Sequence, residues 1–194
     1  MPFAPRQAKI PVTIRPLEDE DIPKIFQFEN SSVSKQYRRD LLTRLEHLFA
    51  DIPTCYVAVT TDNTPVYIQW LMPHTENEKI QAHFNGIFPI LAPDEVLLEN
   101  ALTQEKFRNQ GIRSYSMAII AAYGKKLGAR WAMTFIADHN TPSLKGAKNA
   151  GFVPYMIRHE RWFLFFRSLT FTKLPPCTPY PFETAIPEVS LKQN

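Results

Sequence analysis

The stretch from Glu95 to Gly128 constrains the fold of this chain more than any other. Its first part, Glu95–Thr103, is mostly apolar and predicts a strand, and the polar segment Gln104–Gly111 predicts a turn. The next residues predict a helix that stops at Gly128, because side chains suited to a buried face recur at three- and four-residue spacing at Ile112, Ser116, Ile119, Ile120, Tyr123 and Leu127. A strand, a polar turn and a helix are therefore expected in direct succession.

The turn before this helix has features of an anion-binding site. The first N–H groups of a helix have no partner within the helix, and together with the helix dipole they attract phosphate. Gly111 leaves the backbone bare where an anion would approach, and Arg108 adds a cation three residues earlier. Many junctions of this kind bind nothing, so these residues alone leave a purely structural turn equally open.

Two segments resemble the GNAT acyltransferases, which use acyl-CoA. The segment Arg108–Ile112, followed by a helix, is similar to their acyl-CoA-binding motif: Arg or Gln, two residues, Gly, one residue, then Gly or Ala. Downstream, Asn140–Phe152 resembles their later block, in which an Asn opens a helix that ends in Gly-Phe. The likeness extends more faintly from about Val12 to Phe166. It departs from the family at Arg113, where Gly or Ala is usual, and at Ala147, where many members carry a Tyr that acts as general acid.

The resemblance implies a fold, a reaction and a set of binding residues. The fold is a single α/β domain over residues 1–174, with a mixed, largely antiparallel sheet of about seven strands flanked by about four helices, before a proline-rich tail over residues 175–194. The reaction is transfer of an acyl group, acetyl by default, from acyl-CoA to an amine. The implied CoA contacts are Leu102, Thr103, Arg108, Asn109, Gln110, Gly111, Ile112, Arg113, Ser114, Asn140 and Ser143.

Two other functions remain open at this point. An acyltransferase with a long-chain donor would use the apolar residues between Phe84 and Leu91 as an acyl pocket. A non-catalytic module would bind acyl-CoA as a sensor, which fits the absence of a small residue at Arg113 and of a Tyr at Ala147. The segment 73–94, which fits no single period, is expected to be a helix followed by an extended piece that either covers the acceptor side of a cleft or packs in the core.

Glu99 is the candidate general base. It lies within an otherwise apolar strand, where an unpaired charge is costly and where burial would raise its pKa. The alternative is a solvent-facing residue on an alternating strand. The alternation does not decide between them, because both faces of the strand carry apolar residues beside one polar residue.

Charge and cysteine content set aside several classes of protein. The chain has 22 basic and 19 acidic residues without long runs, so no nucleic-acid partner is expected. The five histidines lack metal-ligand spacing, and the two cysteines, Cys55 and Cys177, are expected to be reduced thiols. No signal peptide and no apolar run of about 18 residues is visible, so a cytoplasmic protein without a membrane partner is expected. A homodimer is left open.

The remaining segments predict further strands and helices. Pro11–Arg15 is expected to be a strand, Asp19 to cap a short helix, and Ser34–Ala50 to be a helix whose arginines, Arg44 among them, face solvent. An antiparallel pair is expected over residues 54–60 and 65–72, and a buried strand with Trp131 over residues 129–137. Two last strands, residues 152–158 and 161–167, are expected to join at residues 159–160, with aromatic side chains in the sheet core at Phe152, Tyr155, Trp162, Phe163, Phe165 and Phe166.

Overall fold

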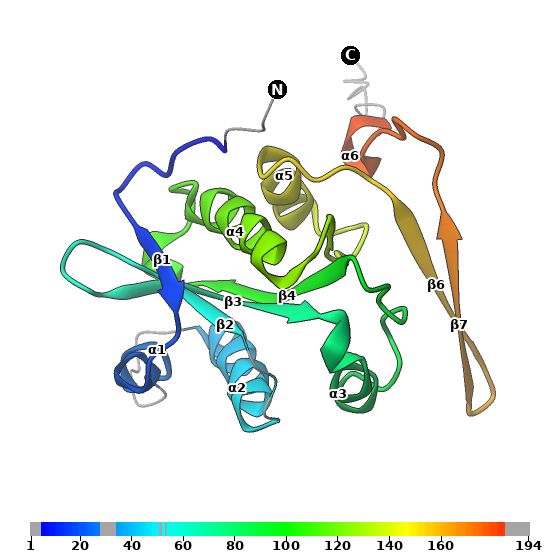
Figure 1. The fold of residues 1–194 in the computed structure, drawn as a ribbon, viewed down its shortest axis with the longest axis horizontal. Helices are drawn as coiled ribbons and strands as arrows, with labels where there is room; N and C mark the ends of the chain where they lie inside the picture. Colours follow the sequence, from blue (N-terminus) through cyan, green and yellow to red (C-terminus); the bar gives the residue numbers. More distant parts are fainter. Residues whose placement is uncertain (1–4, 28–33, 51, 53, 185–194) are drawn as a thin grey trace, which may run out of the picture.

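A five-stranded sheet forms the centre of the molecule (Figure 1). The computed structural model describes residues 5–27, 34–50, 52 and 54–184. The strands follow the order β1-β2-β3-β4-β5; the first four are antiparallel neighbours, and β5 runs parallel to β4. Their bounds are Thr13–Pro16 (β1), Cys55–Val59 (β2), Pro65–Pro73 (β3), Glu95–Thr103 (β4) and Trp131–Met133 (β5).

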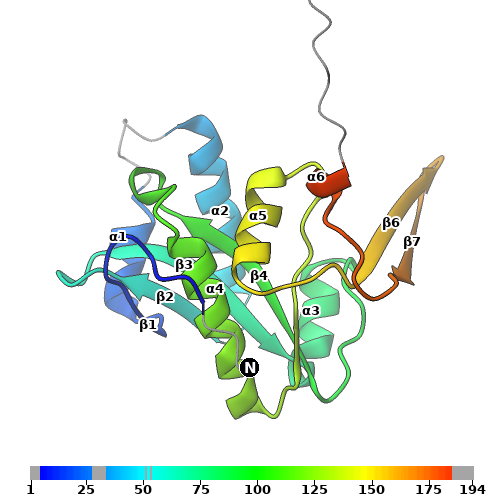
Figure 2. The same cartoon turned by 90° about the horizontal axis from the view of Figure 1, so that it is seen from above.

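Helices cover both faces of this sheet (Figures 1 and 2). On one face lie α4 and α5, and on the other lie α1, α2 and α3 (Figure 1). The helix bounds are Ile22–Ile25 (α1), Lys35–Phe49 (α2), Asn77–His83 (α3), Ile112–Tyr123 (α4), Thr141–Asn149 (α5) and Pro181–Thr184 (α6). Short 3-10 turns add Asp19–Asp21, His74–Glu76, Glu105–Phe107 and Gly124–Leu127.

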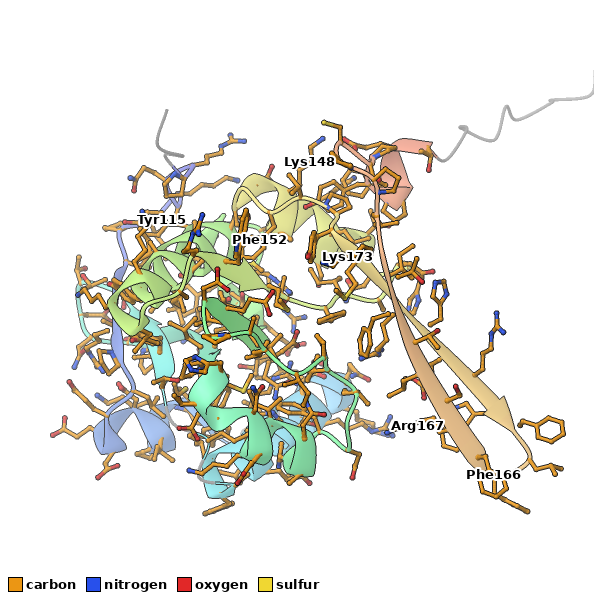
Figure 3. All side chains as sticks on the ribbon, turned by 45° about the vertical axis from the view of Figure 1, so that its right-hand side comes forward. Tyr115, Lys148, Phe152, Phe166, Arg167 and Lys173 are labelled. Carbon is orange, nitrogen blue, oxygen red and sulfur yellow. The ribbon has the colours of Figure 1, made fainter. Side chains whose placement is uncertain are left out.

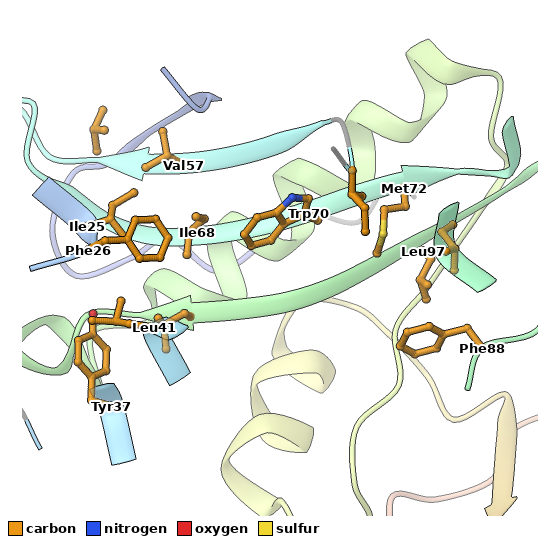
Figure 4. Packing of buried hydrophobic residues seen from close by; sticks show 14 of the residues in the cluster. Ile25, Phe26, Tyr37, Leu41, Val57, Ile68, Trp70, Met72, Phe88 and Leu97 are labelled. Atoms are coloured by element: carbon orange, nitrogen blue, oxygen red, sulfur yellow. The ribbon is translucent and has the colours of Figure 1, made fainter. Parts of the chain in front are cut away.

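Alternation along the strands divides the core into two layers. Successive side chains of a strand point to opposite faces, so Ile68 and Trp70 of β3 face one layer while Tyr67 and Leu71 face the other. The first layer packs against α1, α2 and α3 and is drawn in Figure 4. The second receives Ile112, Met117 and Ile120 of α4. Apolar burial on both faces fixes the register of the sheet, because a one-residue slip would exchange the two layers.

The central strand and helix have the predicted positions. Strand β4 covers Glu95–Thr103, and α4 with its following 3-10 turn runs from Ile112 to Leu127, where Gly128 adopts a left-handed φ of 82°. Helix α2 begins after Ser34, whose side chain accepts a hydrogen bond from the Tyr37 N–H. The short helix near Asp19 differs: Glu18, not Asp19, is the residue before its first turn.

The prediction of one sheet of about seven strands is wrong in its arrangement. Strands β6 (Met156–Phe163) and β7 (Phe166–Lys173) form a separate two-stranded sheet (Figure 2). Their turn lies at Leu164 and Phe165, not at residues 159–160. Strand β5 is also shorter than expected, and its Trp131 is 62% exposed.

The aromatic residues of the hairpin were assigned to the core incorrectly. Trp162, Phe163, Phe165 and Phe166 are all exposed, and so is Tyr155, whereas Phe152 is partly buried against the α4 layer. A two-stranded ribbon has no second layer of its own to cover both faces, so these side chains meet solvent.

The described part of the proline-rich segment packs against α5. Tyr180 is buried, and its hydroxyl donates to the Phe152 carbonyl at 2.7 Å. Lys148 of α5 forms an ion pair with Glu183 of α6. Residues 185–194 of the expected tail lie outside the described part of the chain.

Candidate active site

Strands β4 and β5 pair only along their first three residues. The parallel register joins Glu95, Val96 and Leu97 to Trp131, Ala132 and Met133, and it ends there. Among the described residues, the edge of β4 from Glu99 to Thr103 that faces α5 therefore has no strand beside it. The carbonyls of Asn100 and Ala101 in this stretch accept hydrogen bonds from Arg44. Its other backbone groups on the side without a strand can pair with an extended ligand, as at a free strand edge.

The Glu99 carboxylate bridges the opening between the two strands. Its Oε1 accepts a hydrogen bond from the Phe135 N–H at 2.7 Å, and the Thr134 hydroxyl lies 3.5 Å from the same oxygen. Burial raises the pKa of Glu99 to about 7, against the lowering effect of the Phe135 and Asn100 N–H groups, of the Arg113 charge and of the Thr134 hydroxyl. A carboxylate with this pKa exchanges a proton readily near neutral pH, as a general base requires.

A polar pocket opens beside this carboxylate. Its volume is about 180 Å³, and it is bordered by α2, β3, β4, α4, α5 and the segment after β5. The predicted residues Glu99, Arg113, Asn140 and Ser143 all line it. The remaining lining residues are Arg44, Gln69, Asn100, Ala101, Thr134, Phe135, Ile136 and Ala137.

Arg113 spans the gap between α4 and α5. Its Nη1 donates to the Ser143 hydroxyl at 2.9 Å, and Ser143 N–H in turn donates to Asn140 Oδ1 at 3.2 Å. Asn140 is thus the N-cap of α5, as the resemblance to the GNAT block implied. The buried Nε of Arg113 has no hydrogen-bond partner among the described residues, and the same holds for the side-chain amide nitrogen of Asn100. Both residues line the pocket, but these two nitrogens are themselves shielded from solvent.

Arg44 is a pocket residue that sequence reasoning assigned to solvent. Its Nε and Nη2 donate to the carbonyls of Asn100 and Ala101, each at 3.3 Å. The register of β3 and β4 shifts here, and Asn100 has a left-handed φ of 57°, so the arginine holds a bulge in β4 next to Glu99. The signal available in the sequence was only the position of Arg44 between Leu41 and Leu48 on the inward side of α2.

Gly111 lies in the turn before α4, as expected, but its backbone conformation is a further reason why a glycine is needed there. Gly111 has a φ of 77°, which favours glycine. A Cβ at this position would lie 3.6 Å from Ala8 Cα, and Lys9 N–H donates to the Gln110 carbonyl at 2.8 Å. The segment Gln7–Lys9 therefore lies against the turn, and it occupies part of the surface predicted to be bare.

The other predicted CoA contacts lie outside the pocket. Leu102 and Thr103 belong to β4 and pair with Ile68 and Tyr67 on the β3 side. Arg108 lies 3.6 Å from Glu105 and over the ring of Tyr37. Asn109 has a left-handed φ of 63°, and Gln110, Ile112 and Ser114 surround the start of α4, where Ile112 is buried.

In the described part of the chain no tyrosine lines the pocket, and Ala147, where many GNAT members carry a Tyr, is buried in the α4 layer. Among the described residues, the tyrosines nearest in sequence to α4 and α5, Tyr115, Tyr123 and Tyr155, do not line the pocket. Tyr67 lies closer: its hydroxyl donates to Gln69 Oε1 at 2.6 Å, and Gln69 is a lining residue. Burial raises the pKa of Tyr67, so it stays protonated at neutral pH.

The segment between β3 and β4 packs in the core. Ile80, Phe88 and Leu91 are buried in the layer beneath the sheet, and Phe84 and Ile87 pack against it. Of the two roles left open for this segment, the packing favours core formation over a cover for the cleft.

Comparisons place this fold among N-acetyltransferases. No protein-family model matches the sequence, and no curated protein matches it significantly. Among solved structures, a protein provisionally assigned as a phosphinothricin N-acetyltransferase is 19% identical with a TM-score of 0.52, and the match covers 83% of this chain and 96% of that one. The aminoglycoside N-acetyltransferase AAC(6')-Iy in complex with CoA is 17% identical with a TM-score of 0.50, over 86% and 99%.

A second structure of AAC(6')-Iy contains a bisubstrate analogue, CoA-S-monomethyl-acetylneamine. It is 16% identical to this chain with a TM-score of 0.50, over 81% of this chain and 97% of that one. The chain therefore has the fold of the GNAT acetyltransferases, and the resemblance inferred from two short motifs is confirmed at that level.

Proposed function

We propose that this protein transfers an acyl group, acetyl by default, from a CoA thioester to an amine, with Glu99 as general base. The observation that carries the proposal is the Glu99 carboxylate, which lies at the opening between β4 and β5 in a polar pocket and has its pKa raised to about 7 by burial. The shared fold with acetyltransferases supports the same reaction class.

The residues around the pocket have separate roles in this proposal. The N–H groups at the start of α4, from Ile112 to Ser114, would bind the pyrophosphate, because they have no partner within the helix. The unpaired edge of β4 up to Thr103 would hydrogen-bond the pantetheine arm. Arg113, Asn140 and Ser143, which line the pocket, would contact the arm or its thiol end.

The chemistry needs one proton acceptor. The amine nitrogen attacks the thioester carbonyl carbon, the C–S bond breaks, and the amine proton passes to Glu99 directly or through one water. The departing sulfur leaves as a thiolate; an ordinary thiol has a pKa near 8.5, so this is a fair leaving group near neutral pH without a dedicated acid. The lack of a phenol at Ala147 is consistent with this route.

The test is amine-dependent release of CoA thiol from acetyl-CoA over a panel of small amines, amino acids, amino sugars and peptides. Glu99→Gln should lower kcat/KM by about 10² to 10⁴, the usual contribution of a positioned base, while calorimetry shows CoA binding retained. The control is Glu46→Gln, which changes an exposed glutamate of α2. Equal rates for wild type and Glu99→Gln would remove Glu99 from the mechanism.

One observation favours a second function, that of an acyl-CoA sensor. The Arg113 side chain reaches across to Ser143 between α4 and α5, where a small residue would leave space. If the wild type binds CoA but acylates no amine in the panel, the protein is an acyl-CoA sensor and not an acyltransferase.

A further inference from the structure

The tip of the β6–β7 hairpin is apolar and exposed. Five consecutive residues, Trp162–Phe166, are 64 to 94% exposed. The hairpin stands at the margin of the molecule (Figure 2), and Figure 3 shows Phe166 at its far end. Continuous exposed apolar surface of this kind on a folded domain marks an interaction site.

The tip is apolar on every side, which restricts what can cover it. A strand that packs on one protein surface alternates between apolar and polar residues, because successive side chains point to opposite faces. Trp162 and Phe163 are adjacent on β6, and the turn residues Leu164 and Phe165 are apolar as well. An apolar solvent that surrounds the tip removes all of these side chains from water at once, whereas a flat protein surface covers only one side of the tip.

Basic residues flank the tip on both strands. Arg161 precedes it and Arg167 follows it, and in the register Trp162 lies opposite Arg167 while Arg161 lies opposite Ser168. Arg161 and Arg167 therefore lie at nearly the same distance from the turn along their two strands. From Met156 to Lys173 the hairpin contains four Arg or Lys residues and one acidic residue, Glu160. The surface that meets this hairpin should accordingly be negatively charged.

Contacts with the body hold the hairpin in place. Arg167 donates to the Asn85 carbonyl, and Arg158 Nη1 donates to the Ile87 carbonyl at 3.2 Å. Phe171 of β7 packs edge-on against Phe135, with ring centroids 6.0 Å apart. The hairpin is thus held to the segment after α3 by Arg158 and, next to the tip, by Arg167, and to the segment after β5 by Phe171. The five tip residues are not part of these contacts.

We propose that the hairpin tip docks on an anionic lipid bilayer, with Trp162–Phe166 in the boundary between headgroups and acyl chains and Arg161 at the level of the lipid phosphates. Tryptophan and other aromatic side chains favour this boundary, and basic residues beside an apolar element add attraction to anionic lipids. No helix in the described part of the chain is long and apolar enough to cross a bilayer, so attachment would be to the surface. The expectation of no membrane partner rested on the absence of an apolar run long enough to span a bilayer. It does not apply to a hairpin that touches only the bilayer surface.

The test is co-sedimentation of the full chain with vesicles of 70% phosphatidylcholine and 30% phosphatidylserine. Wild type should bind, and it should bind pure phosphatidylcholine vesicles several-fold more weakly. Phe165→Ser should weaken binding by about tenfold or more. Phe165 is 94% exposed in the free protein, and the variant lacks the favourable free energy of moving this side chain from water into the apolar boundary. Arg161→Glu should also weaken binding, and raising the salt concentration should shrink its effect.

Phe49→Ser is the matched control, since Phe49 is likewise exposed but lies on α2. It should leave vesicle binding unchanged, and circular dichroism should show both Ser variants folded. Sedimentation velocity without vesicles separates lipid from a second copy of the chain: wild type and Phe165→Ser should sediment alike. The proposal would be overturned if wild type did not bind the vesicles, or if Phe165→Ser bound them equally well. It would also be overturned if wild type sedimented faster than Phe165→Ser without vesicles, since this would indicate a dimer formed through the tip.

Discussion

Glu99 combines a hydrogen bond that favours its charge with surroundings that oppose it. The Phe135 N–H stabilises the carboxylate, but burial outweighs this and raises the pKa of Glu99 to about 7. The sequence indicated the residue, because a carboxylate within an apolar strand is unusual. It could not decide which way the side chain points, because the bulge at Asn100 changes the alternation of β4.

The pKa of Glu99 has a consequence for stability that does not depend on function. A carboxyl whose folded-state pKa is raised binds more protons when folded, so its stabilising contribution is complete below the unfolded pKa, near 4.5, and is lost as pH rises through about 7. The free energy of unfolding of wild type relative to Glu99→Gln should therefore fall between pH 5 and pH 8. Urea unfolding of both proteins at several pH values measures this difference, and a difference that is constant with pH would contradict the raised pKa.

The elements differ in how far local sequence determines them. Strand β4 and helix α4 were predicted well because their apolar periods are long and Gly128 ends the helix. The β6–β7 turn was misplaced because Leu164 and Phe165 carry no turn signal, while polar residues at 159–160 suggested one. Helix α2 was found, yet Arg44 was assigned to solvent, because hydrogen bonding to a bulge on another strand leaves no mark in the sequence of the helix.

The buried Asp21 ties the first turn after β1 to the sheet through an ion pair with Arg15. Both oxygens of the buried Asp21 accept from Arg15, at 2.6 and 2.9 Å. Burial alone would raise the pKa of Asp21, but the bonds from Arg15 and the Glu18 N–H lower it. Asp21→Ala should reduce the free energy of unfolding by about 2 to 3 kcal/mol, since it leaves a charged donor without its partner.

The control for this change is Asp19→Asn, which alters an exposed acid in the same turn and should shift stability by no more than about 0.5 kcal/mol. Urea unfolding at neutral pH measures both variants. If the two substitutions cost the same, the Arg15 pair does not hold this element to the sheet.

At the scale of the whole molecule, sequence patterns predicted the layers better than the edge of the sheet. The class of fold followed from two motifs and the order of elements, and it matches solved acetyltransferases. The prediction of a single seven-stranded sheet was wrong, because pairing at the β5 edge depends on contacts between segments far apart in the chain. The pocket arises at that edge: β5 leaves β4 after three residues, and side chains from α2, α4 and α5 meet in the gap.

The most direct test of the central claim is hydrogen–deuterium exchange of the full chain with and without saturating acetyl-CoA. Bound ligand should slow exchange in two places, the start of α4 around Gly111–Ser114 and the unpaired edge of β4 from Glu99 to Thr103. Exchange in β1 and β2, on the far side of the sheet, should stay unchanged. Protection confined to other segments, or none at millimolar acetyl-CoA, would contradict an acyl-CoA site between β4 and α5.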